Sequence, residues 1–334
     1  MANSKHKIVV TGGAGFIGSH VAQVYCDAGL EVVVIDNLSS GKKENIPAAA
    51  KFYKADICDA KAMGAIFEKE KPTVVNHHAA QIDVQTSIAN PAEDAQINIC
   101  GGLNLLELSR KHGVEQWIYA SSGGALYGEI KNAAATETAA VNPISPYGIS
   151  KYGLEKYIEL YGRLYNLNYS ILRYANVYGP RQIAKAEGGV VAIFIQNILK
   201  GEAPTIYGDG NQSRDYVFVE DVAEANVQAL PHHLFPDRRP ALRAKQVVGL
   251  KNREKKIINI ATGVEASILG LFDSLKKELK FHGNPKFAPQ RPGEIVRSLL
   301  DPSLAKRILN WEATASLKEG LQKTIAWTRS FYML

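Results

Sequence analysis

The chain has 334 residues, of which 46% are hydrophobic and 22% are charged, and its formal net charge is +6. This length is enough for one large hydrophobic core or two modest ones, and the composition is that of an ordinary globular enzyme. Because no apolar run approaches the roughly 18 residues that a membrane-spanning helix needs and no secretory leader precedes Lys5, we expect a cytoplasmic protein that makes no use of a membrane.

The N-terminal segment predicts a phosphate-binding turn. An apolar run over residues 8–10 is typical of a buried parallel strand, and Gly12, Gly15, Gly18 and a helical pattern through Ala28 follow it. In such a turn the first glycine permits a tight bend, the second lets a pyrophosphate approach the backbone, and the third allows close packing of the helix. The free N–H groups at the start of the helix also favour a phosphate.

A second apolar strand, over residues 31–36, ends in the carboxylate of Asp36. At this distance after a glycine-rich turn, an acidic residue accepts hydrogen bonds from both hydroxyls of a ribose and repels a 2′-phosphate. Asp36 therefore favours NAD over NADP. The alternative, a carboxylate that merely ends the strand, fits this context less well.

Strand and helix patterns alternate through the first half of the chain. Strands separated by helices imply a parallel sheet with helices on both faces and with ligands at the carboxyl ends of its strands. After Arg173 the pattern loosens into loop signals. We therefore predict an α/β fold, with a doubly wound Rossmann parallel sheet in residues 1–175 and a smaller α/β substrate domain in residues 176–334. The predicted strands are residues 52–56, 73–77, 116–120 and 169–173, and the predicted helices are residues 61–70, 92–112 and 147–165.

Tyr147 and Lys151 lie four residues apart at the start of a predicted helix, so their side chains share one face. A phenol beside an ammonium ion is suited to removing a proton from a sugar hydroxyl. Bringing the pKa of a tyrosine from about 10 to about 7 takes roughly 4 kcal/mol, whereas an exposed ion pair supplies only about 0–1 kcal/mol. We therefore expect a partly desolvated site in which Lys151 and a nicotinamide charge lower the pKa of Tyr147. Together with the N-terminal turn, the pair predicts hydride chemistry at an alcohol carbon.

The positive charge is concentrated in one stretch of the sequence. Residues 231–256 hold eight Lys/Arg and two acidic residues, which accounts for the whole net charge of +6. No nucleic-acid-binding motif accompanies it, so we predict a solvated basic insertion and no nucleic-acid partner. A dimer contact or an acidic partner is the alternative. The three cysteines (Cys26, Cys58 and Cys100) and the pair His77 and His78 lack metal-ligand spacing, so we expect no metal.

Motifs over nearly the whole chain resemble those of the extended short-chain dehydrogenase/reductase family, and within it those of the UDP-glucose 4-epimerases. They lie at residues 11–20, 36–38, 56–57, 77–80, 98, 121–122, 147, 151, 173–180, 214–216 and 291–294. The resemblance implies that bound NAD⁺ takes a hydride from C4 of the sugar while Tyr147 removes the O4 proton. The 4-keto sugar would then turn over, and the hydride would return to its other face. Lys151 would tune Tyr147 and hold the nicotinamide ribose, and the net reaction would be an isomerisation.

The resemblance also implies binding residues. NAD would be held by Gly12, Gly15, Phe16, Ile17, Gly18, Asp36, Asn37, Asp56, Ile57, Ala79, Ala80, Gln81, Asn98, Ser121, Tyr147, Lys151 and Tyr174. The UDP-sugar would be held by Ser122, Gly123, Tyr147, Asn176, Val190, Val191, Thr205, Ile206, Tyr207, Arg214, Arg291, Glu294 and Ser298. In this assignment Arg214 and Arg291 bind the diphosphate, which suits a forked guanidinium group, and Tyr207 stacks on the uracil.

Four neighbouring positions, residues 122–125, narrow the expected activity. Gly124 and Ala125 stand where the related dehydratases carry an acidic pair, and without an acid–base pair an elimination has no proton carrier. Most of the epimerases have Ser or Thr at the position of Gly123. Ser122 is our candidate to hydrogen-bond O4, and a water held by the glycine backbone is the rival. A Ser122 that contacts only the cofactor or the backbone is the third interpretation.

The resemblance bears on substrate breadth as well. In these enzymes a tyrosine at the position of Ser298 excludes N-acetyl sugars and a small residue admits them. We therefore predict activity on UDP-GlcNAc and UDP-GalNAc as well as on UDP-glucose and UDP-galactose. The alternatives are a UDP-glucuronate 4-epimerase, with Lys185 facing the C6 carboxylate, a net oxidoreductase that releases NADH, and a non-catalytic nucleotide sensor.

A homodimer is the last implication of the resemblance. The helices near residues 92–112 and 147–165 resemble the pair that forms a four-helix interface in the family. We expect their outward faces to include Leu105, Leu108, Leu154 and Tyr161.

Overall fold

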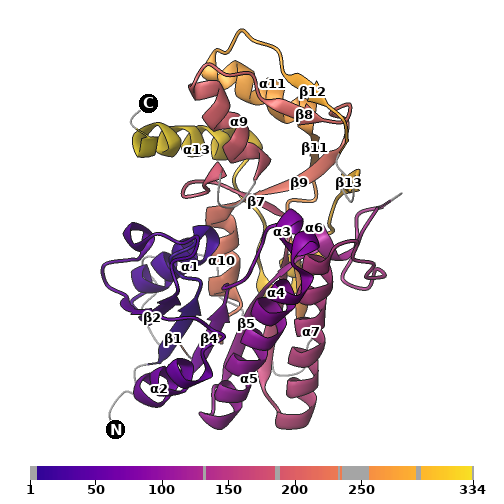
Figure 1. The fold of residues 1–334 in the computed structure, drawn as a ribbon. Helices are drawn as coiled ribbons and strands as arrows, with labels where there is room; N and C mark the ends of the chain where they lie inside the picture. Colours follow the sequence, from indigo (N-terminus) through magenta and orange to yellow (C-terminus); the bar gives the residue numbers. More distant parts are fainter. Residues whose placement is uncertain are drawn as a thin grey trace.

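The computed structural model describes residues 6–130, 133–184, 189–231, 234, 256–290 and 295–332. A large layered part contains the N-terminal half of the chain, and a smaller part lies at one end of it (Figure 1). Lys185, Arg291, Glu294 and nearly all of the basic stretch 231–256 lie outside the described residues.

The large part is built on a seven-stranded sheet in which every neighbouring pair of strands is parallel. The strand order is β10-β6-β5-β4-β1-β2-β3. The direction of winding therefore reverses between β1 and β4, and a ligand site is expected beside this reversal, at the carboxyl ends of the strands. The strands are β1 (Lys7–Thr11), β2 (Glu31–Asp36), β3 (Lys51–Lys54), β4 (Val74–His77), β5 (Gln116–Ser122), β6 (Asn168–Tyr174) and β10 (Ile257–Ile260).

Helices cover both faces of this sheet because its strands are apolar on both sides. One face packs against α1 (Phe16–Asp27), α10 (Val219–Gln228) and α12 (Ser303–Leu309). The other packs against α2 (Ala60–Glu70), α5 (Gly102–Lys111) and α7 (Pro146–Tyr165). The fold class predicted from the sequence is confirmed.

The long helix predicted over residues 92–112 is present without a break from Pro91 to Lys111, and it contains a π-helical segment. The structure has α3 (Val84–Ala89), α4 (Pro91–Ala95), a π-helix (Gln96–Gly101) and then α5. A π-helical turn contains an extra residue and often occurs at functional sites. Here it carries Asn98, whose side chain bonds the main chain of Gln81 on both sides, with the Gln81 N–H donating at 2.8 Å and the Gln81 carbonyl accepting at 3.0 Å.

The smaller part has its own apolar core, formed by α9, α11 and α13 around short strands. In the central sheet β9 pairs with β11, β13 and β7. The elements of the smaller part are β7 (Asn176–Tyr178), α9 (Val190–Leu199), β8 (Thr205–Tyr207), β9 (Ser213–Phe218), β11 (Glu265–Ser267), α11 (Ile268–Leu279), β12 (Lys286–Ala288), β13 (Arg297–Ser298) and α13 (Leu317–Tyr332). Two further short helices, η1 (Lys43–Asn45) and α6 (Gly123–Leu126), belong to the large part.

The chain crosses between the two parts more than once. After β9, α10 packs against α1, and β10 pairs with β6 from Ile257↔Ile171 to Ile260↔Tyr174. The large sheet therefore contains segments from both sides of the predicted boundary at residue 175. The division into residues 1–175 and 176–334 stays a prediction. In the structure, α10, β10 and α12 pack into the large part, although they follow residue 175 in the sequence.

The surface differs from the expectation in one respect. Leu105, Leu108 and Leu154 are buried in the core beneath the sheet, so the prediction that they face outward is wrong. These three leucines lie on the core-facing sides of two amphipathic helices. The spacing of apolar residues in the sequence did not show which side of each helix faces the core. The exposed apolar side chains of α7 are Ile149, Tyr157, Leu160, Leu164 and Tyr165.

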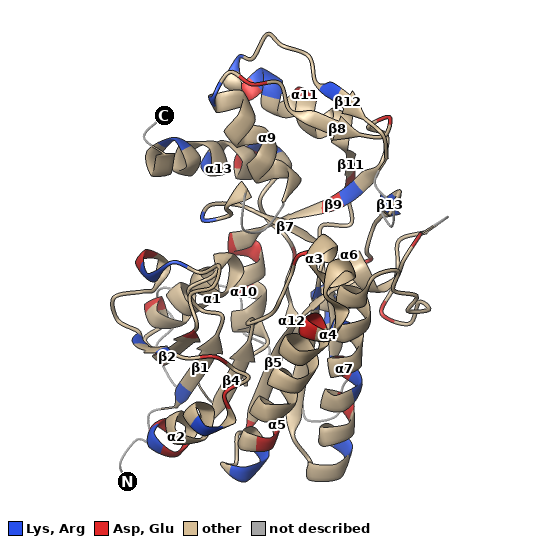
Figure 2. Ribbon diagram, in the orientation of Figure 1, with Lys and Arg blue, Asp and Glu red and all other residues tan. Residues whose placement is uncertain are grey.

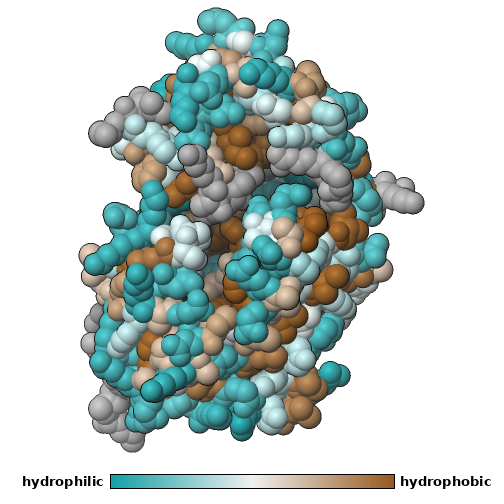
Figure 3. All heavy atoms as spheres, viewed as in Figure 1, coloured by the Kyte–Doolittle hydropathy of each residue, from teal (hydrophilic) through white to brown (hydrophobic). Residues whose placement is uncertain are grey.

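Figure 3 shows hydrophobic surface along the side of the molecule where α7 lies in Figure 1. Lysine, arginine and acidic residues are interspersed along α2, α5 and α7 (Figure 2). Of the helices that the structure describes, none is both long and apolar enough to cross a membrane, and no cluster of metal-ligating side chains occurs among the described residues.

Candidate active site

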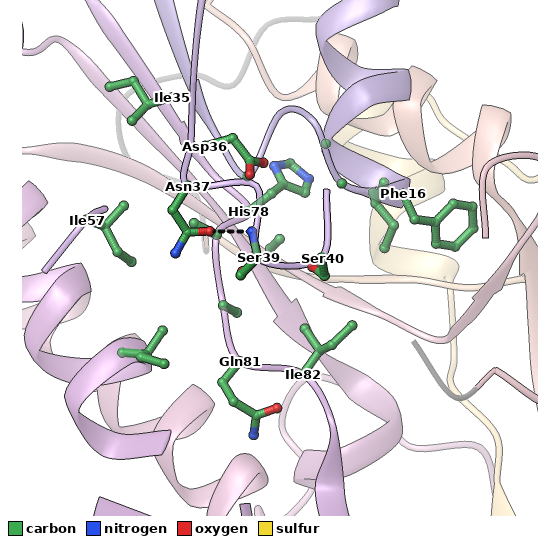
Figure 4. A pocket seen from close by; sticks show the side chains of 18 of the residues that line it. Phe16, Ile35, Asp36, Asn37, Ser39, Ser40, Ile57, His78, Gln81 and Ile82 are labelled. Carbon is green, nitrogen blue, oxygen red and sulfur yellow. Dashed lines mark hydrogen bonds between the residues drawn. The ribbon is translucent and has the colours of Figure 1, made fainter. Parts of the chain in front are cut away.

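A cavity of about 400 Å³ opens at the carboxyl ends of β1, β2 and β4, where the winding of the sheet reverses. Figure 4 shows Asp36, Asn37 and His78 on its wall, with Gln81 and Ile82 below them. All the residues predicted to hold NAD line this cavity except Asn98, which lies behind Gln81 and bonds its backbone. Lining residues that the sequence analysis did not assign to NAD are Ile35, Ser39, Ser40, Ala55, His78, Ile82, Asp83, Ile97 and Ala120.

The glycine-rich turn has no room for side chains. Gly12 has φ +68°, and a Cβ there would lie 2.6 Å from the backbone nitrogen of Ala79. A Cβ on Gly18 would lie 2.2 Å from the carbonyl oxygen of Gly12. Gly15 caps α1 without a side-chain hydrogen bond, so the first N–H groups of the helix point at the cavity with no intrahelical acceptor. These features fit a diphosphate at the start of α1.

Asp36 joins the two loops that form the upper wall of the cavity. One carboxylate oxygen accepts from the N–H of Ala14 at 3.0 Å, and the other accepts from the N–H of Leu38 at 2.8 Å. Asn37 follows, its carbonyl oxygen accepting from Ser39 (Figure 4) and its amide donating to Asp56 at 2.9 Å. Each Asp36 oxygen retains a second lone pair, so the carboxylate can still accept ribose hydroxyls.

Tyr147 and Lys151 lie on the opposite wall, in the first two turns of α7. The helix begins there because Ser145 accepts a hydrogen bond from the N–H of Gly148 and Pro146 occupies the first helical position. Burial lowers the pKa of Lys151 to about 7, although the charges of Glu155 and Asp94 oppose that shift. Of the three predicted catalytic residues, Tyr147 and Lys151 therefore line the same cavity.

In the protein without NAD, the pKa of Tyr147 lies above its ordinary value. Burial raises it to about 12, a hydrogen bond with Ser122 opposes this shift, and the charge of Asp94 adds to it. The expectation that Lys151 and a nicotinamide charge together lower this pKa concerns the protein with NAD bound, and it stays a prediction. In the protein alone the cost of burying the phenolate prevails, and Lys151 itself is drawn towards its neutral form.

Ser122 lies at the end of β5 and does not line the cavity, but its side chain reaches Tyr147. Of the three interpretations left open for this residue, its contact with Tyr147 favours the one in which it acts near O4. Its role stays a prediction. Gly123 begins α6, where an added Cβ would lie 2.3 Å from Leu300, so a serine or threonine at this position would need Leu300 to move.

Two buried carboxylates lie next to this pair, and the sequence analysis missed both. Glu155 is fully buried, accepts from Ser121 at 2.6 Å and forms a two-pronged ion pair with Arg173. Asp94 accepts from Gln81 at 2.9 Å and from Asn98 at 3.1 Å. The spacing of Glu155, one helical turn after Lys151, was the available signal.

Of the residues predicted to hold the UDP-sugar, Ser122, Gly123 and Tyr147 lie on β5, α6 and α7 of the large part. The other described ones lie on the smaller part, and only Tyr147 of the whole described set lines the cavity. Pairing of β9 with β13 sets Arg214 opposite Ser298, and pairing with β7 sets Tyr216 opposite Asn176. The buried carbonyl oxygen of Asn176 has no hydrogen-bond partner and faces Gly124. Arg291 and Glu294 lie outside the described residues.

The side chains of this second group differ in what they can contact. Val191 and Ile206 are buried in the core of the smaller part, so only their backbone can face a ligand. Thr205, Tyr207 and Val190 are half-buried. An unpredicted contact joins the two parts here, because Glu129 accepts from the N–H of Val296 at 2.5 Å.

A model of the NAD dependent epimerase/dehydratase family matches residues 8–238. The chain belongs to this family. It is 44% identical to a putative UDP-glucose 4-epimerase of Methanocaldococcus jannaschii, over 97% of this chain and 98% of that relative. The solved UDP-glucose 4-epimerase of Thermotoga maritima, with UDP-glucose, matches it with a TM-score of 0.89 and 44% identity, covering 98% of this chain and 99% of that one. The solved UDP-glucose 4-epimerase of Thermus thermophilus, with NAD, matches with a TM-score of 0.85 and 39% identity, covering 97% and 99%.

These matches confirm the resemblance to the extended short-chain dehydrogenase/reductase family. They extend over the smaller part as well as the large sheet. Membership of an NAD-dependent family agrees with the narrow glycine turn and with Asp36 on the cavity wall.

Proposed function

We propose that this protein interconverts UDP-hexoses that are epimeric at C4, UDP-glucose and UDP-galactose first of all, with NAD held in the cavity. The observation that carries the proposal is the position of a half-buried Tyr147 and a buried Lys151 on the wall of the same cavity as the glycine-rich turn and Asp36. The proposal is also supported by the similarity of nearly the whole chain to enzymes named as UDP-glucose 4-epimerases.

The chain's own residues have three tasks in this reaction. The N–H groups at the start of α1 and the carboxylate of Asp36 hold the dinucleotide, which supplies a hydride acceptor when bound. Tyr147 accepts the proton of the sugar O4 and later returns it. Lys151 supports the charge that develops on Tyr147, and Ser122 orients the hydroxyl through its contact with the phenol.

Elimination is disfavoured by the residues at the start of α6. Gly124 and Ala125 supply no acid or base beside the sugar. Epimerisation needs no proton carrier beyond Tyr147, because the same proton leaves and returns. The residues present therefore suit an isomerase better than a dehydratase.

The test is to incubate the purified protein with UDP-galactose, without added cofactor, and to separate the nucleotide sugars. We expect UDP-glucose to form while the protein retains its NAD. Release of NADH with a 4-keto product would indicate an oxidoreductase, and binding without turnover would indicate a sensor. Either result would contradict the proposal.

A UDP-glucuronate 4-epimerase is the less supported alternative. It needs a cation facing the C6 carboxylate, and the candidate, Lys185, lies outside the described residues. The relatives reported above carry the UDP-glucose name. Parallel incubation with UDP-glucuronate tests this alternative, and turnover faster than with UDP-galactose would favour it.

We further infer that the protein is a cytoplasmic homodimer that joins through α7. Ile149, Tyr157, Leu160 and Leu164 are exposed at spacings that place them within one narrow stripe of this helix. Such a stripe on a surface helix is typical of an interface between proteins. Three unpaired cysteines fit a reducing compartment.

A further inference from the structure

Lys151 is buried without a close partner for its charge. Only 4% of the residue is exposed, and among the described residues no carboxylate lies within ion-pair distance of its ammonium group. The two nearest carboxylates act on it only through space and are engaged elsewhere, Glu155 with Arg173 and Asp94 with Gln81. A buried ammonium ion in this position needs another source of stabilisation.

The aromatic ring of Tyr119 lies directly against that ammonium group. The Lys151 Nζ is 4.5 Å from the centroid of the ring, which is within the range of a cation–π contact. Tyr119 is only 1% exposed, so water does not weaken the contact. The Tyr119 hydroxyl also donates to the backbone carbonyl of Lys151 at 3.4 Å. One tyrosine thus touches both ends of the same lysine.

Tyr119 is itself held in place by the sheet. It lies on β5, opposite His77 of β4 on one side and Ile171 of β6 on the other. The His77 ring stacks on it at 5.7 Å with an angle of 17° between the planes, and Trp117 stacks at 6.1 Å. The ring therefore has little freedom to move away from Lys151.

The other titratable groups near Lys151 are two histidines, two carboxylates and the phenol of Tyr147. His77 and His78, on and after β4, stay neutral because burial first, and the charge of Lys151 second, lower the pKa of both imidazoles. Glu155 on α7 and Asp94 on α4 are the negative charges, and Tyr147 is the phenol that the lysine serves.

We propose that Tyr119 is a positioning residue for the catalytic lysine: its ring face holds the Lys151 ammonium group charged and directed at the cavity, and its hydroxyl fixes the helical turn that carries the lysine. The inference rests on the proposed function for the importance of Lys151, but the contact itself is independent of it. The competing explanation is that Tyr119 only fills the core.

A titration of Lys151 separates the two explanations. The protein is labelled with ¹³Cε-lysine, the Lys151 signal is identified by its loss in Lys151→Met, and its pKa is measured by NMR in the wild type, Tyr119→Leu and Tyr119→Phe. We expect Tyr119→Leu to lower the pKa of Lys151 by about one unit, since a desolvated cation–π contact is of that size. Tyr119→Phe, which keeps the ring, should restore most of the difference. Phe67→Leu, which removes a buried ring of the same core layer on α2, should leave the pKa unchanged.

An equal pKa in the wild type and Tyr119→Leu would overturn the proposal. If Tyr119→Leu does not fold, phenylalanines bearing increasing numbers of fluorine atoms at position 119 replace it, because fluorine weakens the negative ring face at nearly constant size. A stepwise fall in the pKa of Lys151 then supports the proposal, and a constant pKa overturns it.

Turnover of UDP-galactose gives a second readout. Tyr119→Leu should lower kcat at little change in KM and move the alkaline limb of the kcat profile to lower pH, and Tyr119→Phe should restore both. The titration uses no sugar, so an absence of epimerase activity would count against the proposed function and leave the result on Tyr119 standing. A normal kcat profile in Tyr119→Leu, with a lowered pKa of Lys151, would show that the contact exists but does not serve catalysis, and would also overturn the positioning role.

Discussion

At the scale of single residues, the protein matrix around Tyr147 opposes the ionisation that catalysis requires. Its pKa is raised to about 12, and bringing it to about 7 takes roughly 7 kcal/mol. Lys151 cannot supply all of this, because burial lowers its own pKa to about 7 and leaves it only partly charged near neutral pH. The balance must come from positive charge bound in the same cavity. This dependence would make proton removal efficient only in the protein loaded with oxidised NAD.

Ser122 is the residue whose removal tests the geometry around the phenol. Its hydrogen bond with Tyr147 opposes the rise that burial causes in the pKa of that tyrosine. We expect Ser122→Ala to reduce kcat on UDP-galactose at least about tenfold, within the usual size of proton-transfer effects. Ser170→Ala, a buried serine on β6 that bonds Gln116, is the control and should stay near the wild-type rate. A loss smaller than about twofold in Ser122→Ala would assign the serine to the backbone or cofactor instead.

Ser298 tests substrate breadth. It is 3% exposed and pairs with Arg214 across β9 and β13, so a large side chain there has to enter the space beside that strand. We expect the wild type to epimerise both UDP-glucose and UDP-GlcNAc, and Ser298→Tyr to lose only the N-acetyl activity, by about 100-fold, as a steric block does. Ser298→Ala is the matched control and should keep both activities. Equal loss of both activities in Ser298→Tyr would contradict a gate.

At the scale of elements, the sheet is stabilised at the end remote from the cavity by Glu70, the last residue of α2. Its carboxylate bonds Lys7 of β1 and both Lys51 and Tyr53 of β3. Burial opposes ionisation, but these hydrogen bonds prevail and lower the pKa of Glu70 to about 2. A carboxyl whose pKa is depressed on folding contributes stability above its unfolded pKa, near 4.5, and loses it as the pH falls towards 2.

We therefore expect Glu70→Gln to lower the Tm at pH 7 by a few degrees, about what the loss of roughly 2 kcal/mol of charged hydrogen bonds produces. The difference from the wild type should narrow as the pH falls from 5 to 3. Glu68→Gln, whose side chain is 73% exposed, is the control and should unfold with the wild type. A difference in Tm that does not change with pH would show that packing, not charge, explains the effect.

Sequence reasoning succeeded for elements with strong local patterns and failed where distant contacts decide. The alternation of apolar strands with helices predicted β1 to β6 and α7 to within a few residues. It could not assign β10 to the large sheet, because Ile257–Ile260 is a short run that pairs with a strand far earlier in the chain. The π-helix was missed as well, since an extra residue in one turn leaves no mark on apolar spacing.

The residues of the candidate site also differ in whether the sequence could predict them. The glycine turn, Asp36, Tyr147 and Lys151 could be found because each belongs to a short motif with a physical reason for its spacing. Asp94 and Tyr119 could not, because their importance comes from burial beside Lys151. For Glu155 the only signal was its spacing of one helical turn after Lys151. The raised pKa of Tyr147 in the protein without NAD could not be predicted either, because the cost of burying a phenolate is invisible in the sequence.

At the scale of the whole molecule, the feature that remains without a partner within the described part of the chain is the exposed apolar stripe on α7, formed by Ile149, Tyr157, Leu160 and Leu164. If two copies join through this stripe, charges placed in it must separate them. We expect the double variant Leu160→Glu/Leu164→Glu to halve the mass measured by light scattering, because buried unpaired carboxylates are costly. Phe287→Glu, at an exposed apolar position on β12, is the control and should keep the mass of the wild type. A wild-type protein that is already monomeric would remove the proposed interface.

The account depends on Tyr147 as the group that accepts and returns the proton of O4 beside bound NAD. The most direct measurement is the rate of UDP-galactose epimerisation by Tyr147→Phe, with bound NAD measured in the same preparation. The ring stays in place and only the hydroxyl is lost, so we predict unchanged NAD content and a kcat reduced by about 100-fold or more. A variant that retains its NAD and interconverts the sugars at the wild-type rate would contradict the account.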